Sequence, residues 1–133
     1  MRISGSSRVF FPGWVNQEQI IALMKISKVG LAPYIQSDNF EMPNKVFEYM
    51  AGELAVLSSL GGSFKTLLNK NTFGSSYNSD SIEEFSETLL NMYNFQDNTI
   101  KMAKSAHELF IKKFRQTIIF DNSEKYILNL INQ

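Results

Sequence analysis

Met42-Pro43-Asn44-Lys45-Val46-Phe47-Glu48-Tyr49-Met50-Ala51-Gly52 has the pattern of a short helix. Pro43 suits the first helical turn, because its φ is fixed and the N–H that it lacks would have no partner there, and Gly52 is a typical end. At about 100° per residue, the apolar side chains of this stretch gather on one face. We therefore predict a helix over residues 43–52 with Val46, Phe47, Met50 and Ala51 on its buried face and Lys45, Glu48, Tyr49 and Gly52 on its exposed face.

Apolar runs on both sides of this helix predict buried strands. Val29-Gly30-Leu31-Ala32-Pro33-Tyr34 precedes the helix, followed by the polar loop Gln36-Ser37-Asp38-Asn39, and Leu54-Ala55-Val56-Leu57-Ser58 comes after the helix. Strands that alternate with helices favour a parallel sheet that is covered on both faces. A helix that starts at the carboxyl end of such a strand offers unpaired N–H groups and a partial positive charge, so we expect an anion site at this junction.

The rest of the chain continues the same alternation. Arg8-Val9-Phe10-Phe11, ended by Pro12-Gly13, predicts another buried strand ahead of a helix that Asn16 caps. Gly61-Gly62 could let the backbone approach a ligand, but an ordinary turn is the preferred interpretation. The predicted fold class is therefore α/β, a Rossmann-like parallel sheet of four strands flanked by helices. The remaining expected elements are a helix with Leu67 and Leu68, a strand from Phe73 to Tyr77, a helix over 81–94 capped by Asn78 or Asp80, and helices over 98–114 and 123–132.

Length and composition indicate one globular domain. The chain has 133 residues, 44% of them hydrophobic, and no apolar run long enough to span a bilayer. Its 13 basic and 13 acidic side chains cancel, which argues against the positive field of a nucleic-acid-binding protein. The absence of cysteine excludes disulfides, thiolate zinc sites and thiol catalysis. No signal-peptide pattern opens the sequence, so the expected location is cytoplasmic.

Four segments, taken in order, resemble the C-terminal domain of group 1 (family 4) glycosyltransferases. The resemblance covers almost the whole chain from about Val9 onward. It implies the later part of the nucleotide-sugar-binding C-terminal domain of a GT-B enzyme. Residues 1–133 would then be a single partial domain with residues 1–7 as a tail or linker, and two β/α units and an N-terminal acceptor-binding domain would lie upstream. The segments are Gly13-Trp14-Val15, Val29 to Tyr34, Pro43 to Gly52, and Val56-Leu57-Ser58-Ser59.

The resemblance also implies an activity. Such enzymes are retaining glycosyltransferases whose donor substrate is a nucleotide-diphosphate sugar, here a UDP- or GDP-sugar, and the scheme requires no metal or other cofactor. The implied role is bacterial surface polysaccharide or lipopolysaccharide synthesis, with the full enzyme associated peripherally with the inner face of the cell membrane. The basic residues that neutralise the diphosphate in the family would lie upstream, so we expect this chain alone to be inactive and assign no catalytic residue.

Three residues of the helix over 43–52 are the candidate nucleotide-sugar site. In the family, the glutamate at the position of Glu48 accepts hydrogen bonds from the ribose hydroxyls, a task that suits a carboxylate with two acceptor oxygens. The alternative for Glu48 is a surface ion pair with Lys45. The main-chain N–H groups of Asn44 and Lys45, with the Lys45 ammonium, are expected at the diphosphate or sugar; the alternative for Lys45 is a solvated surface charge. Phe40 stands where many members carry another glutamate, and we do not transfer that role to Glu41.

Other features have structural alternatives. Trp14 and Tyr34 are expected at strand ends, where an aromatic ring can stack on a base or fill the sheet edge. His107 has no second metal ligand at a useful spacing, so a structural role is expected. A solvated helix face is the preferred interpretation of the basic residues Lys101, Lys104, Lys112, Lys113 and Arg115.

A rival function is a non-catalytic interaction module derived from half of a glycosyltransferase. Nucleotide binding separates this hypothesis from the enzyme hypothesis. In either case, a strand at residues 8–11 would have an unpaired edge, so we expect self-association unless residues 1–7 or the helix over 123–132 cover that edge.

Overall fold

The computed structural model describes residues 9–35 and 42–131 of the chain. Helices and strands alternate as far as the third strand, and the chain is helical from there on, so the predicted α/β class is confirmed. The elements are α1 (Gln17–Ile26), β1 (Val29–Ala32), α2 (Asn44–Ala51), β2 (Ala55–Ser58), α3 (Gly62–Asn71), β3 (Gly74–Ser76), α4 (Ile82–Asn94), α5 (Gln96–Leu109), the π-helix η1 (Phe110–Phe114) and α6 (Gln116–Ile131).

The strands form a parallel sheet in the order β1-β2-β3. Val29 lies opposite Ala55, and Val56 lies opposite Gly74. All four residues of β2 are buried, because this strand has a neighbour on each side and helices on both faces. Enclosure on both faces explains why Ala55, Val56 and Leu57 lack the alternation of a half-exposed strand. The polar Ser58 is tolerated at the end of the strand because its hydroxyl is hydrogen-bonded.

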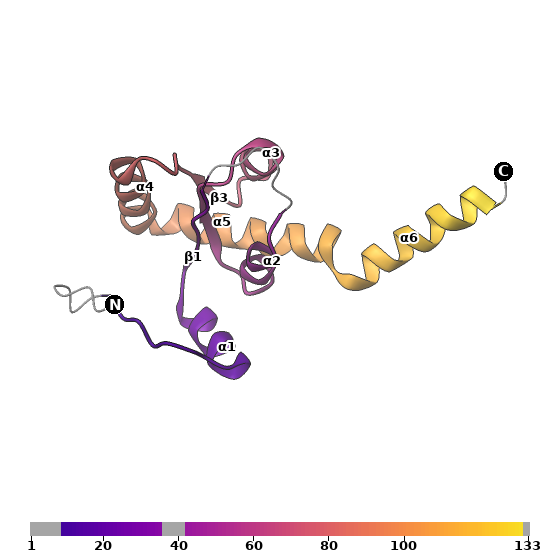
Figure 1. Ribbon diagram of the computed structural model, residues 1–133, viewed down its shortest axis with the longest axis horizontal. Coiled ribbons are helices and arrows are strands. Elements are labelled where there is room, and N and C mark those ends of the chain that lie inside the picture. Colours follow the sequence, from indigo (N-terminus) through magenta and orange to yellow (C-terminus); the bar gives the residue numbers. More distant parts are fainter. Residues whose placement is uncertain (1–8, 36–41, 132–133) are drawn as a thin grey trace.

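Helices cover both faces of the sheet, and α5 crosses behind the strands in the view of Figure 1. One face packs against α2, α3 and the later part of α5, and the other packs against α4 and the earlier part of α5. Helix α5 therefore serves both cores: Ala103 belongs to the second core, and Ala106 and Leu109 belong to the first. The first core includes Ala32, Val46, Met50, Val56, Leu60, Phe64, Leu68 and Phe73, and the second includes Ala55, Leu57 and Met92.

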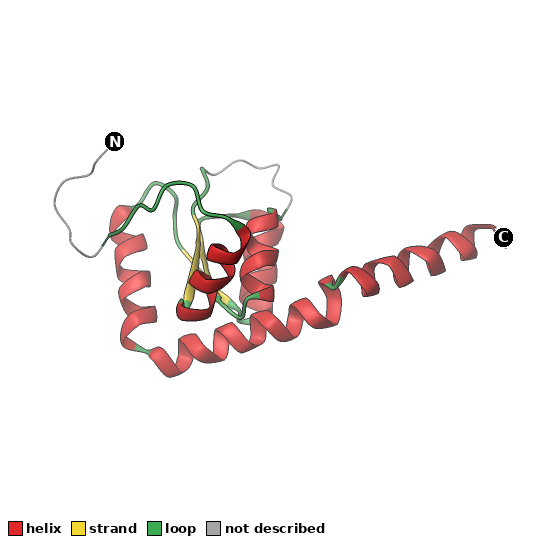
Figure 2. Cartoon of the chain, turned by 90° about the horizontal axis from the view of Figure 1, so that it is seen from below, coloured by secondary structure: helices red, strands yellow, loops and turns green. Residues whose placement is uncertain are grey.

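Helices α1 and α6 extend away from this body (Figure 1), and Figure 2 shows the projection of α6 again. No residue of α1 is buried, and neither is any residue over 116–129 of α6. The chain turns into α6 at Arg115, whose ψ of 136° interrupts the helix after η1. Both helices expose apolar side chains, among them Ile20, Ile21, Phe120 and Ile127. Nevertheless, no helix in the described part of the chain is long and apolar enough to cross a membrane.

The strand predicted at Arg8–Phe11 is wrong over the residues that the structure describes. Val9, Phe10 and Phe11 form no strand, and their side chains are 60%, 85% and 68% exposed. An apolar run becomes a strand only where a neighbouring strand satisfies its backbone groups. The described strands pair in the order β1-β2-β3, and residues 9–11 pair with none of them.

Several predicted boundaries also move. Pro43 is the N-cap of α2 and lies outside its first turn. The cap of α4 is Ser81, whose hydroxyl accepts a hydrogen bond from the Glu84 N–H at 3.1 Å, so the prediction of Asn78 or Asp80 is wrong. A serine directly before the helix reaches that N–H, whereas the two earlier residues lie in the preceding turn. Helix α5 begins at Gln96 and α6 begins at Gln116, both earlier in the sequence than predicted.

Candidate functional site

Two buried serines join the carboxyl ends of β1 and β2. Ser58 Oγ donates to the carbonyl oxygen of Ala32 at 2.9 Å. Ser59 Oγ accepts from the N–H of Tyr34 and donates to the carbonyl oxygen of the same residue, both at 2.7 Å. Because both serines are buried, these bonds form away from water and fix the backbone at this edge of the sheet. No role was predicted for these serines from the sequence. The pattern that could have indicated one is a pair of small polar residues at the end of a buried apolar run.

Helices α2 and α3, which follow these two strands, lack the groups that usually complete a helix start. Their N-caps are Pro43 and Gly61; neither provides a side-chain hydrogen bond, and neither first turn contains an acid. The N–H groups of Asn44 and Lys45 lie in the first turn of α2, where no helical carbonyl reaches them. Partial positive charge therefore remains at both helix starts, beside the carboxyl ends of the strands. This edge of the sheet is suited to an anion.

The three predicted site residues lie on the exposed side of α2. Asn44, Lys45 and Glu48 are all exposed within two turns of helix. Lys45 Nζ lies 5.6 Å from the centroid of the Tyr34 ring, within the range of a cation–π interaction. Among the described residues, the structure gives Lys45 a contact with this ring.

Glu48 lines a hollow of about 520 Å³ between α1 and α2. The α1 wall is formed largely by apolar side chains, together with Gln17 and Lys25. A single carboxylate facing such a wall can accept hydrogen bonds from hydroxyl groups while the wall covers the less polar part of a ligand. The α1 residues here are Gln17, Ile20, Ile21, Met24 and Lys25, and the α2 residues are Glu48 and Ala51, joined by Gly52.

Tyr49 lies against the sheet, so its predicted place on the exposed face of α2 is wrong. Its ring covers Gly30, where any added side chain would overlap it, and its hydroxyl donates to the Leu31 carbonyl at 2.9 Å. Burial raises the pKa of Tyr49 above its usual value, and the charges of Tyr34 and Glu48 act in the same direction. The helical pattern missed this because a long side chain can reach back over a strand wherever a glycine leaves room. Ala51, predicted to be buried, is exposed.

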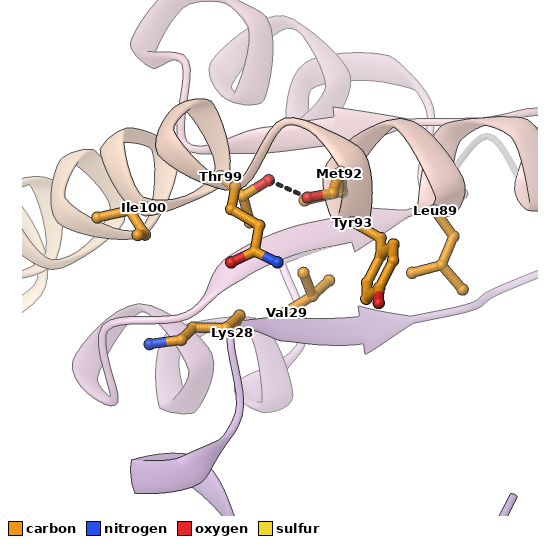
Figure 3. Close-up of a pocket in the computed structure, with 8 residues that line it drawn as sticks. Lys28, Val29, Leu89, Met92, Tyr93, Thr99 and Ile100 are labelled. Atoms are coloured by element: carbon orange, nitrogen blue, oxygen red, sulfur yellow. Dashed lines mark hydrogen bonds between the residues drawn. The ribbon is translucent and has the colours of Figure 1, made fainter. Parts of the chain in front are cut away.

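A second hollow, of about 310 Å³, lies at the amino end of β1, away from the strand ends that Ser58 and Ser59 join (Figure 3). Val29 forms one wall, and Leu89, Met92 and Tyr93 of α4 form another (Figure 3). Thr99 Oγ1 donates to the Met92 carbonyl at 2.6 Å and is therefore already satisfied. Most of the lining is apolar, and its charged residue is Lys28. The hollow therefore has no carboxylate that could accept hydrogen bonds from ribose hydroxyls.

The remaining candidate residues include some that the structure places away from the candidate site and some that lie outside the described residues. Trp14 is 96% exposed and follows no strand, so its predicted place at a strand end is wrong. His107 Nδ1 lies 3.1 Å from the Ala51 carbonyl oxygen and links α5 to the end of α2. Among the described residues, no cluster of three or more His, Cys, Asp or Glu side chains could hold a metal ion. Phe40, Glu41 and the loop Gln36–Asn39 lie outside the described residues.

Comparison with known protein families identifies the family of this chain. The family model described as glycosyl transferases group 1 matches residues 1–94, from the start of the chain to the end of α4. The chain belongs to the group 1 glycosyltransferases. The matched range contains all of β1 to β3 and all three candidate residues of α2, whereas α5 and α6 lie beyond it. No curated protein and no solved structure gave a significant match to the chain.

Proposed function

We propose that this glycosyltransferase chain is the nucleotide-sugar-binding, C-terminal part of a retaining GT-B enzyme whose donor is a UDP- or GDP-sugar. Membership of the group 1 family carries the proposal. The incomplete starts of α2 and α3 support it, because they offer an anion such as a diphosphate two electropositive helix ends at the edge where α/β sheets bind ligands.

In this proposal the site residues divide the donor between them. Glu48 accepts hydrogen bonds from the ribose hydroxyls, while the N–H groups of Asn44 and Lys45 and the Lys45 ammonium meet the diphosphate. Pro43 has no N–H to donate. Donors fixed in advance near the leaving diphosphate stabilise the negative charge that develops on it as the glycosyl group is transferred, and the scheme uses no metal or other cofactor.

The proposed reaction needs a second, acceptor-binding domain, because transfer takes place in the cleft between the two halves of a GT-B enzyme. The chain by itself is therefore proposed to bind the donor without turning it over. The acceptor belongs, in this proposal, to bacterial surface polysaccharide or lipopolysaccharide synthesis. The corresponding location is cytoplasmic, with the full enzyme held peripherally at the inner face of the cell membrane.

Amide NMR tests the location of the nucleotide. Titration of the chain with UDP and with GDP should shift the backbone signals of Asn44 to Glu48, with smaller shifts at Gly61 and Gly62. Shifts that cluster around Val29 and Tyr93, in the apolar hollow of Figure 3, would contradict the site. An absence of shifts at millimolar nucleotide would instead favour the non-catalytic interaction module.

Glu48→Ala tests the ribose contact. Loss of a charge-assisted hydrogen bond costs about 1.5–3 kcal/mol, so the affinity for the nucleotide should fall roughly ten- to a hundredfold. Glu108→Ala removes an equally exposed carboxylate from α5, away from the site, and should leave the affinity unchanged. Calorimetric titration of both variants measures the difference. Equal nucleotide affinities in the two variants would mean that Glu48 is only a surface residue. Urea unfolding checks that neither variant has lost its fold.

A further inference from the structure

Tyr34 occupies a fixed position at the end of β1. Its N–H and carbonyl oxygen are both bound to the Ser59 hydroxyl, and Ser59 is only 2% exposed. Its ring is half-buried and packs against the first core. Because both the backbone and the ring are held, one face of the ring is presented in a constant orientation. An aromatic face fixed in this way can position a cation.

Lys45 is the cation at that ring face, 5.6 Å from the ring centroid. It is the second residue of α2, where the helix dipole disfavours a positive charge. The first turn holds no acid to compensate for it. A lysine free to rotate at such a position would turn its ammonium towards water and away from the helix axis. The ring opposes this by keeping the ammonium beside the helix start.

We propose that Tyr34 is a positioning residue, whose ring holds the Lys45 ammonium next to the first-turn N–H groups of α2 so that both meet the diphosphate of the donor. This inference rests on the proposed function and adds a residue to its site. The ring acts through Lys45, so its contribution belongs to the diphosphate and not to the nucleoside. Removing the ring should therefore weaken the binding of a nucleoside diphosphate but not that of the corresponding nucleoside.

The experiment compares Tyr34→Phe, which keeps the ring, with Tyr34→Leu, which removes it. UDP with uridine, and GDP with guanosine, are titrated by calorimetry or NMR. Tyr34→Leu should lower the affinity for the diphosphate that binds by about two- to fivefold, the usual size of an exposed cation–π contact. Tyr34→Phe should match the wild-type chain. In a Lys45→Met background, Tyr34→Leu should have no further effect.

The free chain provides a readout that does not depend on nucleotide binding. The ε-methylene protons of Lys45, assigned by their loss in Lys45→Met, should be shifted upfield by the ring current in the wild type and in Tyr34→Phe, and should return to the usual lysine position in Tyr34→Leu. Unshifted signals in the wild type would overturn the inference. An equal loss of nucleoside affinity, or an undiminished effect in the Lys45→Met background, would also overturn it, because Tyr34 would then contact the base directly. If no nucleotide binds at all, the proposed function fails, and the lysine signals still decide whether the ring holds the ammonium.

Discussion

Helices α2 and α4 begin in opposite ways. Ser81 caps α4 with its hydroxyl, and the first turn of α4 adds Glu83 and Glu84, so that the orphan N–H groups and the helix dipole are both compensated. Helix α2 starts from Pro43 with no side-chain cap and no acid in its first turn, and it adds a lysine. The first arrangement stabilises the helix by itself. Among the described residues, the second gives the helix start no side-chain compensation, an arrangement that a bound anion would complete.

The largest difference in stability between the two helix starts is expected when the residue at each start is replaced by alanine. Ser81→Ala should lower the free energy of unfolding by about 1 kcal/mol, because the Glu84 N–H loses its acceptor. Asn44→Ala, at the first residue of α2, should change it very little, since that side chain forms no cap. Urea unfolding of the two variants measures the contrast. Similar losses at both positions would mean that the two helix starts are not different in kind.

A charge at the start of α2 should give an intermediate effect. Asn44→Asp places a carboxylate in the first turn and should raise the free energy of unfolding by about 0.3–1 kcal/mol, while weakening nucleotide binding through repulsion of the diphosphate. Asn69→Asp, in the last turn of α3, makes the same substitution at an exposed position near the negative end of a helix and should lower stability instead. If Asn44→Asp stabilises the chain without weakening binding, the start of α2 is not an anion site.

The smallest effect is expected at the start of α3. Gly61→Ser supplies a capping hydroxyl at a position with extended backbone and open space around the added side chain, and it should stabilise the chain by a few tenths of a kcal/mol. Gly62→Ser, with a φ of 57°, should destabilise it because the left-handed region disfavours a side chain. Thermal unfolding distinguishes the two. A loss of stability in Gly61→Ser would show that the start of α3 is already satisfied.

The sequence predicted those parts of the fold that depend on local pattern. The apolar runs at β1 and β2 and the polar face of α2 were recognisable because burial on both faces, or on one, sets their composition. Val9 to Phe11 were misassigned because an apolar run cannot show whether a neighbouring strand exists. Likewise, the contact between Ser59 and Tyr34 joins residues far apart in sequence, and only the register of β1 on β2 brings them together.

For the candidate site, the sequence likewise predicted the residues on α2 but not their contacts with other elements. Asn44, Lys45 and Glu48 were predicted from the loop-to-helix junction and from a family resemblance; the family is confirmed, and the site stays a prediction. The partner of Lys45 was not foreseen, because the Tyr34 ring approaches from another element. The inward place of Tyr49 was missed for the same reason: it depends on Gly30, which is far from it in sequence.

The position of α5 has a practical consequence for how the chain can be shortened. The family match stops at the end of α4, yet Ala103, Ala106 and Leu109 of α5 close both hydrophobic cores. A truncation at the matched boundary would expose both sides of the sheet at once and should give an insoluble product. We expect the smallest folding unit to extend through η1, because Phe114 still packs on Phe47. We expect the residues after Arg115 to be dispensable for folding, because none is buried over 116–129. Expression trials should place the C-terminal boundary there.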